Sequence, residues 1–124
     1  MIISITGSRN LTVTFADIEA HLPDGVTGIV SGGADGVDSV AYRFALSRGL
    51  TTSVIRPDYQ SVPVSRMAPL VRNTDIISQA DYCLFFWDGV SRGTKDTISK
   101  AVKAGKHGKV IVVGACVSNS VIRF

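Results

Sequence analysis

The sequence predicts an α/β protein in which helices cover both faces of a mainly parallel, five-stranded sheet. The first observation is that short apolar segments alternate five times with segments whose apolar residues recur every three to four positions. The second is that the unusual, glycine-rich segments all follow strands, whereas the segments after helices are ordinary stops. Because right-handed crossovers bring the carboxyl ends of parallel strands to one edge, we expect a ligand site at that edge.

The expected elements follow from these patterns. Strands are expected over residues 2–5, 27–30, 51–55, 82–86 and 109–113. Helices are expected from a cap at Thr14 to the turn at residues 23–25, then over 37–45, 68–80 and about 93–104. Residues 56–66 predict a long loop that forms a lid or a wall of the site. For residues 114–124, a short last strand and a partner contact are both open.

Composition limits the class of protein. The chain has 124 residues, so we expect one domain (1–124) with a real core. Its 45% hydrophobic and 19% charged residues are typical of a folded protein. The net charge of +3 is compatible with an anionic ligand but is far from the dense basic surface of nucleic-acid binders. With no secretory signal and no apolar run near the ~20 residues of a membrane span, we expect a cytoplasmic protein without membrane contact.

The sequence shows no pattern typical of a metal site, a bound cofactor or a catalytic Ser-His-Asp or Cys-His set. Cys83 and Cys116 lie in apolar, strand-like segments without metal-ligand spacing, so buried thiols are expected. His21 and His107 fall at the edge where helices stop, away from the expected site. We therefore expect no metal and no bound cofactor.

The segment Ser31-Gly-Gly-Ala-Asp-Gly-Val-Asp38 is the most informative part of the chain. It lies between a strand and a helix, where glycines allow close approach of a ligand and free N–H groups attract anions. We expect Ser31, Gly32 and Gly33 to contact a phosphate or sugar phosphate. Asp35 either caps the helix or accepts from ligand hydroxyls, and for Asp38 we favour capping.

Two further turns have similar chemistry. Gly7, Ser8 and Arg9 follow the first strand, and they either cradle a phosphate beside a forked cation or form a plain turn. Residues 91–95 open the fourth helix, where Gly93, Thr94 and Lys95 again suit an anion. The alternative is that Thr94 is an ordinary cap beside a solvated lysine.

Asn73 interrupts the apolar stripe of the third helix. A buried amide needs hydrogen-bond partners, so it either ties down the glycine turns or contacts the ligand. Its neighbour Arg72 is expected to point toward an opening or solvent. Trp87 either stacks on a base or covers the end of the core.

With these motifs assembled, the chain resembles the SLOG superfamily (SMF/DprA-like and LOG-like proteins), especially its small YspA/YpsA-related, DUF2493-type members. The matching features occur in the family's order: Gly7-Ser8-Arg9, residues 31–38 with Ala41, then Arg72-Asn73, then Gly93-Thr94. The resemblance implies a Rossmann-like sheet that binds a nucleotide or an ADP-ribose-like molecule, and it implies a homodimer or a higher homo-oligomer.

Three functions remain open at this point. The leading hypothesis is a sensor, carrier or sequestering protein for a nucleotide-like phosphate compound. The second is a LOG-like phosphoribohydrolase, although Thr97 occupies the place of that motif's glutamate, so Asp35 or Asp96 would have to replace it. The third is a DprA-like module for single-stranded DNA, which the mild charge and few aromatics do not favour.

Overall fold

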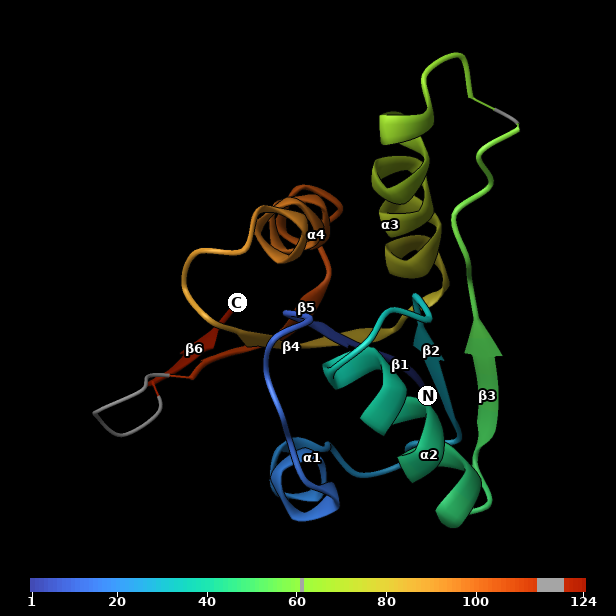
Figure 1. Ribbon diagram of the computed structural model, residues 1–124. Helices are drawn as coiled ribbons and strands as arrows, with labels where there is room; N and C mark the ends of the chain where they lie inside the picture. The colour runs from blue at the N-terminus through green and yellow to red at the C-terminus, as the bar shows by residue number, and fades with distance from the viewer. Residues whose placement is uncertain (61, 114–119) are drawn as a thin grey trace.

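The computed structural model describes residues 1–60, 62–113 and 120–124. Its centre is a six-stranded sheet with the order β3-β2-β1-β4-β5-β6, shown edge-on in Figure 1. The strands are β1 (Ile2–Gly7), β2 (Gly28–Ser31), β3 (Thr51–Val54), β4 (Tyr82–Trp87), β5 (His107–Val112) and β6 (Ser120–Arg123). β1 to β5 pair in parallel, and β6 pairs antiparallel with β5.

The sheet therefore has six strands, one more than the sequence predicts. The five parallel strands lie where the sequence predicts them, within two residues at each end. The sixth falls in the segment for which a strand and a partner contact were both open. A strand of four residues is too short to establish a pattern by itself, and β6 is defined by its pairing with β5. Cys116 lies outside the described residues.

Four helices cover the two faces of the sheet: α1 (Phe15–His21), α2 (Val37–Ser47), α3 (Ala68–Gln79) and α4 (Arg92–Lys103). α1 and α2 lie on one face, and α3 and α4 on the other (Figure 1). A short 3₁₀ helix, η1 (Ser65–Met67), precedes α3 at the end of the long connection from β3. The result is the expected three-layer α/β architecture, compatible with a Rossmann-like fold.

The core is divided by the sheet into two clusters. Successive side chains of a strand point to opposite faces. In β4, accordingly, Leu84 and Phe86 pack in the cluster beneath α1 and α2, while Cys83 and Phe85 pack in the cluster beneath α3 and α4. Because both faces are covered, β4 is apolar at nearly every position, as the sequence showed.

Helix starts decide where polar groups lie at the carboxyl edge. Thr14 caps α1 in a capping box with Asp17, as predicted. The cap of α2 is Gly36, at a φ of 74°, and not Asp35, which is exposed. The cap of α4 is Ser91, so Thr94 lies in the first turn and is not the cap. At neither helix start does the side chain of the cap residue form a capping hydrogen bond.

None of the helices in the described part of the chain combines the length and apolar character that a membrane crossing needs.

Candidate functional site

A hollow of about 440 Å³ opens at the carboxyl edge of the sheet, between the loops that follow β1 and β4 and beneath α3. β1 and β4 are the neighbours at which the strand order reverses, and open α/β sheets bind ligands at such a point. We call it the first hollow. Among the residues predicted for the site, it is lined by Gly7, Ser8, Arg9, Arg72, Asn73, Gly93 and Thr94.

Asp38 joins the loops at the base of the first hollow. Its carboxylate accepts hydrogen bonds from the N–H groups of Gly7 (3.3 Å) and Gly32 (2.9 Å). The side chain is buried, and burial raises its pKa from 3.8 to about 6, against the opposing effect of these N–H donors and of Arg72. Asp38 is therefore a bridge between two glycine loops, and not the helix-capping residue that the sequence favoured.

Two guanidinium groups face the first hollow. Arg9 is exposed at its rim, and Arg72 is half-buried in its wall. Arg72 donates to the carbonyl oxygen of Gly32 (2.6 Å) and to Oδ1 of Asn73 (3.0 Å). Burial and the nearby Arg9 charge both lower the pKa of Arg72, while Asp38 raises it. Two cations that face one space repel each other unless an anion lies between them.

Asn73 connects α3 to α4. Its amide nitrogen donates to Oδ2 of Asp96 (3.3 Å), and the same oxygen accepts from Lys100 in an ion pair (2.7 Å). Lys100 also donates to the carbonyl of Leu70 (2.6 Å). The amide of Asn73 does not bond to the glycine turns directly, because its two ends are held by the side chains of Arg72 and Asp96. Asp96 is likewise engaged by two partners and does not line the hollow.

The loop between β4 and α4 is held by Asp88. Its carboxylate accepts from the N–H groups of Val90 (2.9 Å) and Ser91 (2.7 Å) and from the Ser91 hydroxyl (2.6 Å). These bonds hold the pKa of Asp88 well below its usual range. The Asp88 N–H donates to the Ser8 hydroxyl, which ties this loop to the one after β1. Trp87 donates its indole N–H to Ser91, so it braces the loop.

Unpaired donors face the first hollow as a result. The Ser91 hydroxyl is engaged by Asp88, and no side chain caps α4. The first-turn N–H groups of this helix, which include those of Gly93 and Thr94, lack intrahelical partners. Thr6, 7% exposed, also lines the hollow, and its buried hydroxyl has no hydrogen-bond partner in the described part of the chain. Helix N–H groups and a hydroxyl of this kind bind anionic oxygens.

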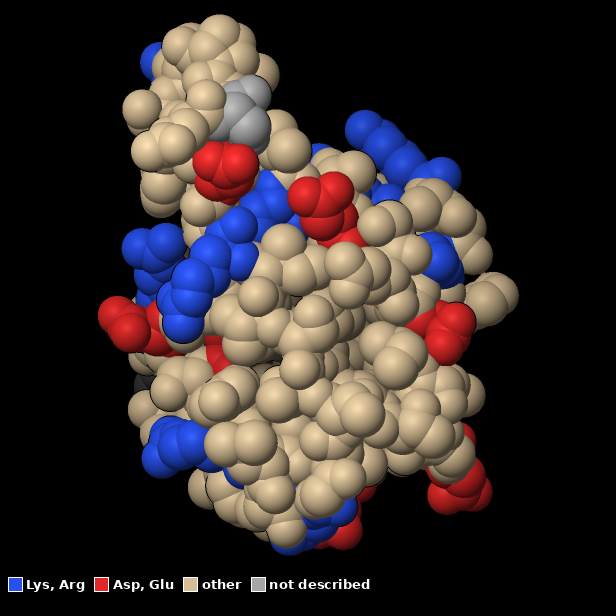
Figure 2. Space-filling model, turned by 90° about the vertical axis from the view of Figure 1, so that its right-hand side faces the viewer, with Lys and Arg blue, Asp and Glu red and all other residues tan. Residues whose placement is uncertain are grey.

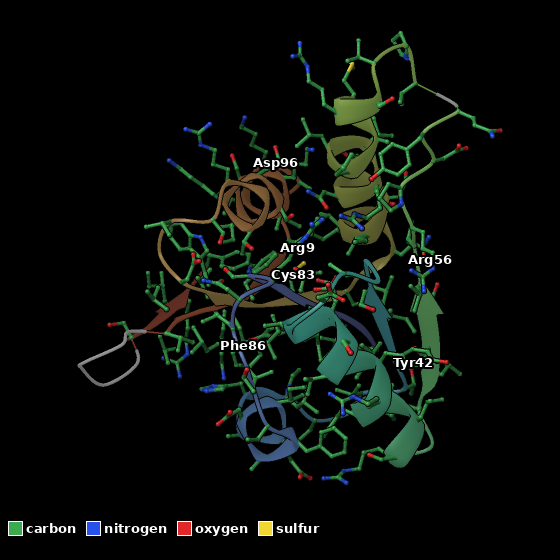
Figure 3. All side chains as sticks on the ribbon, viewed as in Figure 1. Arg9, Tyr42, Arg56, Cys83, Phe86 and Asp96 are labelled. Carbon is green, nitrogen blue, oxygen red and sulfur yellow. The ribbon has the colours of Figure 1, made fainter. Side chains whose placement is uncertain are left out.

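A second hollow, of about 530 Å³, lies on the other side of the loop that enters α2, between α2 and β3. Gly33 and Asp35, which the sequence assigned to the same pocket as Arg9, line this second hollow and not the first. Ala34 and Asp38 line both. Figure 3 shows Arg9 and Arg56 on opposite sides of the entrance to α2.

Three predicted residues line neither hollow. Ser31 is buried at the end of β2, where its carbonyl accepts from Ile55. Gly32 supports the loop, because a Cβ there would lie 2.7 Å from Arg72 Nη1 and 2.9 Å from Asp38 Oδ2. Lys95 is exposed on the outer side of α4.

Sequence reasoning missed the part that Asp38 plays. A signal was present: Asp38, Ala41 and Ala45 are spaced i, i+3, i+7, so they share the buried face of α2. A carboxylate on a buried stripe needs donors, and the adjoining glycine loops are the nearest source. Thr6 and Tyr42, which line the first and the second hollow respectively, are not among the site residues that the sequence indicates.

Comparison of the chain with protein-family models, with curated proteins and with solved structures returned no match.

Proposed function

We propose that this protein binds a nucleotide or nucleotide-derived molecule whose phosphate occupies the first hollow. It would serve as a sensor, carrier or sequestering protein. The motif order that resembles the SLOG superfamily supports the same ligand class, and we propose membership on that basis. A cytoplasmic homo-oligomer remains the expectation from the sequence.

The observation that carries the proposal is that two cationic side chains and one acidic side chain line the first hollow. Arg9 and Arg72 face it, and among the described residues neither forms an ion pair with a carboxylate. The uncapped start of α4 adds the positive end of a helix dipole. The one acidic side chain of the lining, Asp38, is engaged by backbone N–H groups. A dianionic phosphate is the small group that meets all of these donors.

The test is a titration with AMP, followed by thermal denaturation and calorimetry. We expect Tm to rise with AMP concentration, because a ligand that binds only the folded state stabilises it. Arg9→Gln should weaken AMP binding by about tenfold or more, since a hydrogen bond to a charged group contributes about 1.5–3 kcal/mol. The matched control is Arg43→Gln, an exposed arginine of α2 that lines neither hollow.

Two outcomes would contradict the proposal. The first is an unchanged Tm at millimolar AMP. The second is an equal loss of affinity in Arg9→Gln and Arg43→Gln, which would reflect overall charge and not the first hollow.

Hydrolysis of an N-glycosidic bond is the second candidate function. The observation that favours it is the raised pKa of Asp38, about 6, in a carboxyl group that lines the first hollow. A group that titrates near neutral pH is suited to general acid–base catalysis. Asp35 and Asp96, the replacements considered from the sequence, lie outside the first hollow. Release of free adenine from AMP, lost in Asp38→Asn, would establish this function in place of simple binding.

A further inference from the structure

The second hollow differs in chemistry from the first. Its lining includes Asp35, Ser39 and Tyr42 from the start of α2, and Thr52, Val54 and Arg56 from β3 and its following residues. One exposed carboxylate, Asp35, lies opposite one exposed guanidinium, Arg56. Its exposed charged side chains are therefore one acidic and one basic, and the buried carboxylate of Asp38, which also lines it, is engaged by backbone N–H groups. Such a space suits a polar but uncharged group better than a second phosphate.

Two planar side chains border the second hollow. Tyr42 on α2 is 41% exposed, and Arg56 follows β3. Figure 3 shows both on the β3 side of the molecule. The Arg56 guanidinium lies across Gly33, since a Cβ there would be 3.0 Å from its Nη1. Aromatic rings and guanidinium planes are the groups on which proteins stack nucleobases.

The second hollow also contains hydrogen-bonding groups for a nucleoside. The Thr52 hydroxyl is buried, and no described residue forms a hydrogen bond with it. Asp35 is exposed at the rim, and a carboxylate accepts from the paired hydroxyls of a ribose. Figure 2 shows the face that carries β3: Lys and Arg atoms, with Asp and Glu atoms beside them, lie beneath the projecting β3–α3 connection, while the middle of the face is uncharged.

We propose that the second hollow holds the base and ribose of the nucleotide whose phosphate occupies the first hollow. This rests on the proposed function and adds the orientation of the ligand and the residues that select it. The ligand crosses the entrance to α2 at Ala34, which lines both hollows. Gly33, beside Ala34, has a φ of 72°, and a Cβ there would lie 2.7 Å from Val54 Cγ1 and 3.0 Å from Arg56 Nη1, so glycine is required at this point of the loop.

The experiment compares AMP with ribose 5-phosphate, which has the phosphate and sugar but no base. In the wild type, AMP should bind about tenfold more tightly than ribose 5-phosphate, since stacking of a base contributes about 1–3 kcal/mol. Tyr42→Ala should lower AMP affinity by about the same factor and leave ribose 5-phosphate unchanged. Tyr42→Phe should retain AMP affinity, because it keeps the ring.

Arg56→Gln is the second variant and should likewise weaken AMP selectively, with Arg43→Gln as the control for charge. Equal affinities of AMP and ribose 5-phosphate in the wild type would overturn the inference while leaving the proposed function intact. So would an unchanged AMP affinity in both Tyr42→Ala and Arg56→Gln. If neither compound binds the wild type, the proposed function itself fails, and the inference fails with it.

Discussion

At the scale of single residues, one buried carboxylate, that of Asp38, links two glycine-containing segments through hydrogen bonds. Asp38 accepts from the N–H of Gly7, the last residue of β1, and from that of Gly32, the residue after β2. Both glycines are needed for packing: a Cβ on Gly7 would lie 2.7 Å from Val37 Cγ2, and one on Gly32 would meet Arg72. The loops can approach this closely only because a buried acceptor satisfies their N–H groups.

Asp38 predicts a pH dependence of stability. Burial raises its pKa from 3.8 to about 6, so between these values the folded state holds a proton that the unfolded state has lost. Its contribution to stability is complete below about pH 4 and is lost as the pH rises through 6. Urea unfolding should show that wild type loses up to about 3 kcal/mol more than Asp38→Asn between pH 4 and pH 7.5.

Asp35→Asn is the matched control for this measurement, because Asp35 lies three residues away and is exposed. It should keep the wild-type pH profile. Parallel profiles for wild type and Asp38→Asn would show that burial does not perturb this carboxyl.

At the scale of elements, the start of α4 depends on the loop before it. Asp88 accepts three hydrogen bonds from Val90 and Ser91, and the loop then leaves the first turn of α4 without a side-chain cap. A cap at Ser91 would occupy a donor that now faces the first hollow. The arrangement keeps helix N–H groups available at the site while the loop itself is well held.

Asp88→Ala tests this arrangement. Without the carboxylate, the N–H groups of Val90 and Ser91 lose their acceptor, and we expect their amide hydrogen exchange to accelerate by about tenfold. Exchange in the β1–β4 core should stay unchanged, because the bonds lost are local. The matched control is Asp24→Ala, an exposed aspartate in the turn after α1. Unchanged exchange at Val90 and Ser91 would show that these bonds do not hold the loop.

At the scale of the whole molecule, β6 forms one edge of the sheet and covers β5. Gly108 and Phe124 exchange two backbone hydrogen bonds, of 3.2 and 3.1 Å. The Phe124 ring lies 6.1 Å from that of Phe85, between ring centroids, at the core beneath α3 and α4. Without β6, β5 would become an exposed edge strand with unpaired backbone groups.

Deletion of residues 120–124 should therefore lower Tm by about 5 °C or more and promote aggregation, measured by calorimetry and light scattering. Ile122→Thr is the control for the deletion, because Ile122 is 53% exposed and the substitution keeps the backbone pairing of β6 with β5. This variant should stay close to wild type. An unchanged Tm after the deletion would mean that the edge strand contributes little to the fold.

Much of the fold follows from the sequence by itself. Short apolar runs locate the five parallel strands, and apolar residues that recur every three to four positions locate the four helices, because both faces of the sheet and one face of each helix are buried. The rule that parallel strands share a carboxyl edge predicts that Gly7, Arg9 and Thr94 lie at one edge of the sheet, and in the structure all three line the first hollow.

Only the tertiary structure decided that the loop entering α2 separates two hollows at the carboxyl edge of the sheet. It places Gly33 and Asp35 in the second hollow, makes Asp38 a bridge, and adds β6. These features depend on contacts between residues distant in the chain, such as the hydrogen bond of Gly7 to Asp38 and the position of Arg56 over Gly33. Local patterns record which face of an element is buried, but the direction of a polar side chain in a loop is set by the groups that packing brings to it.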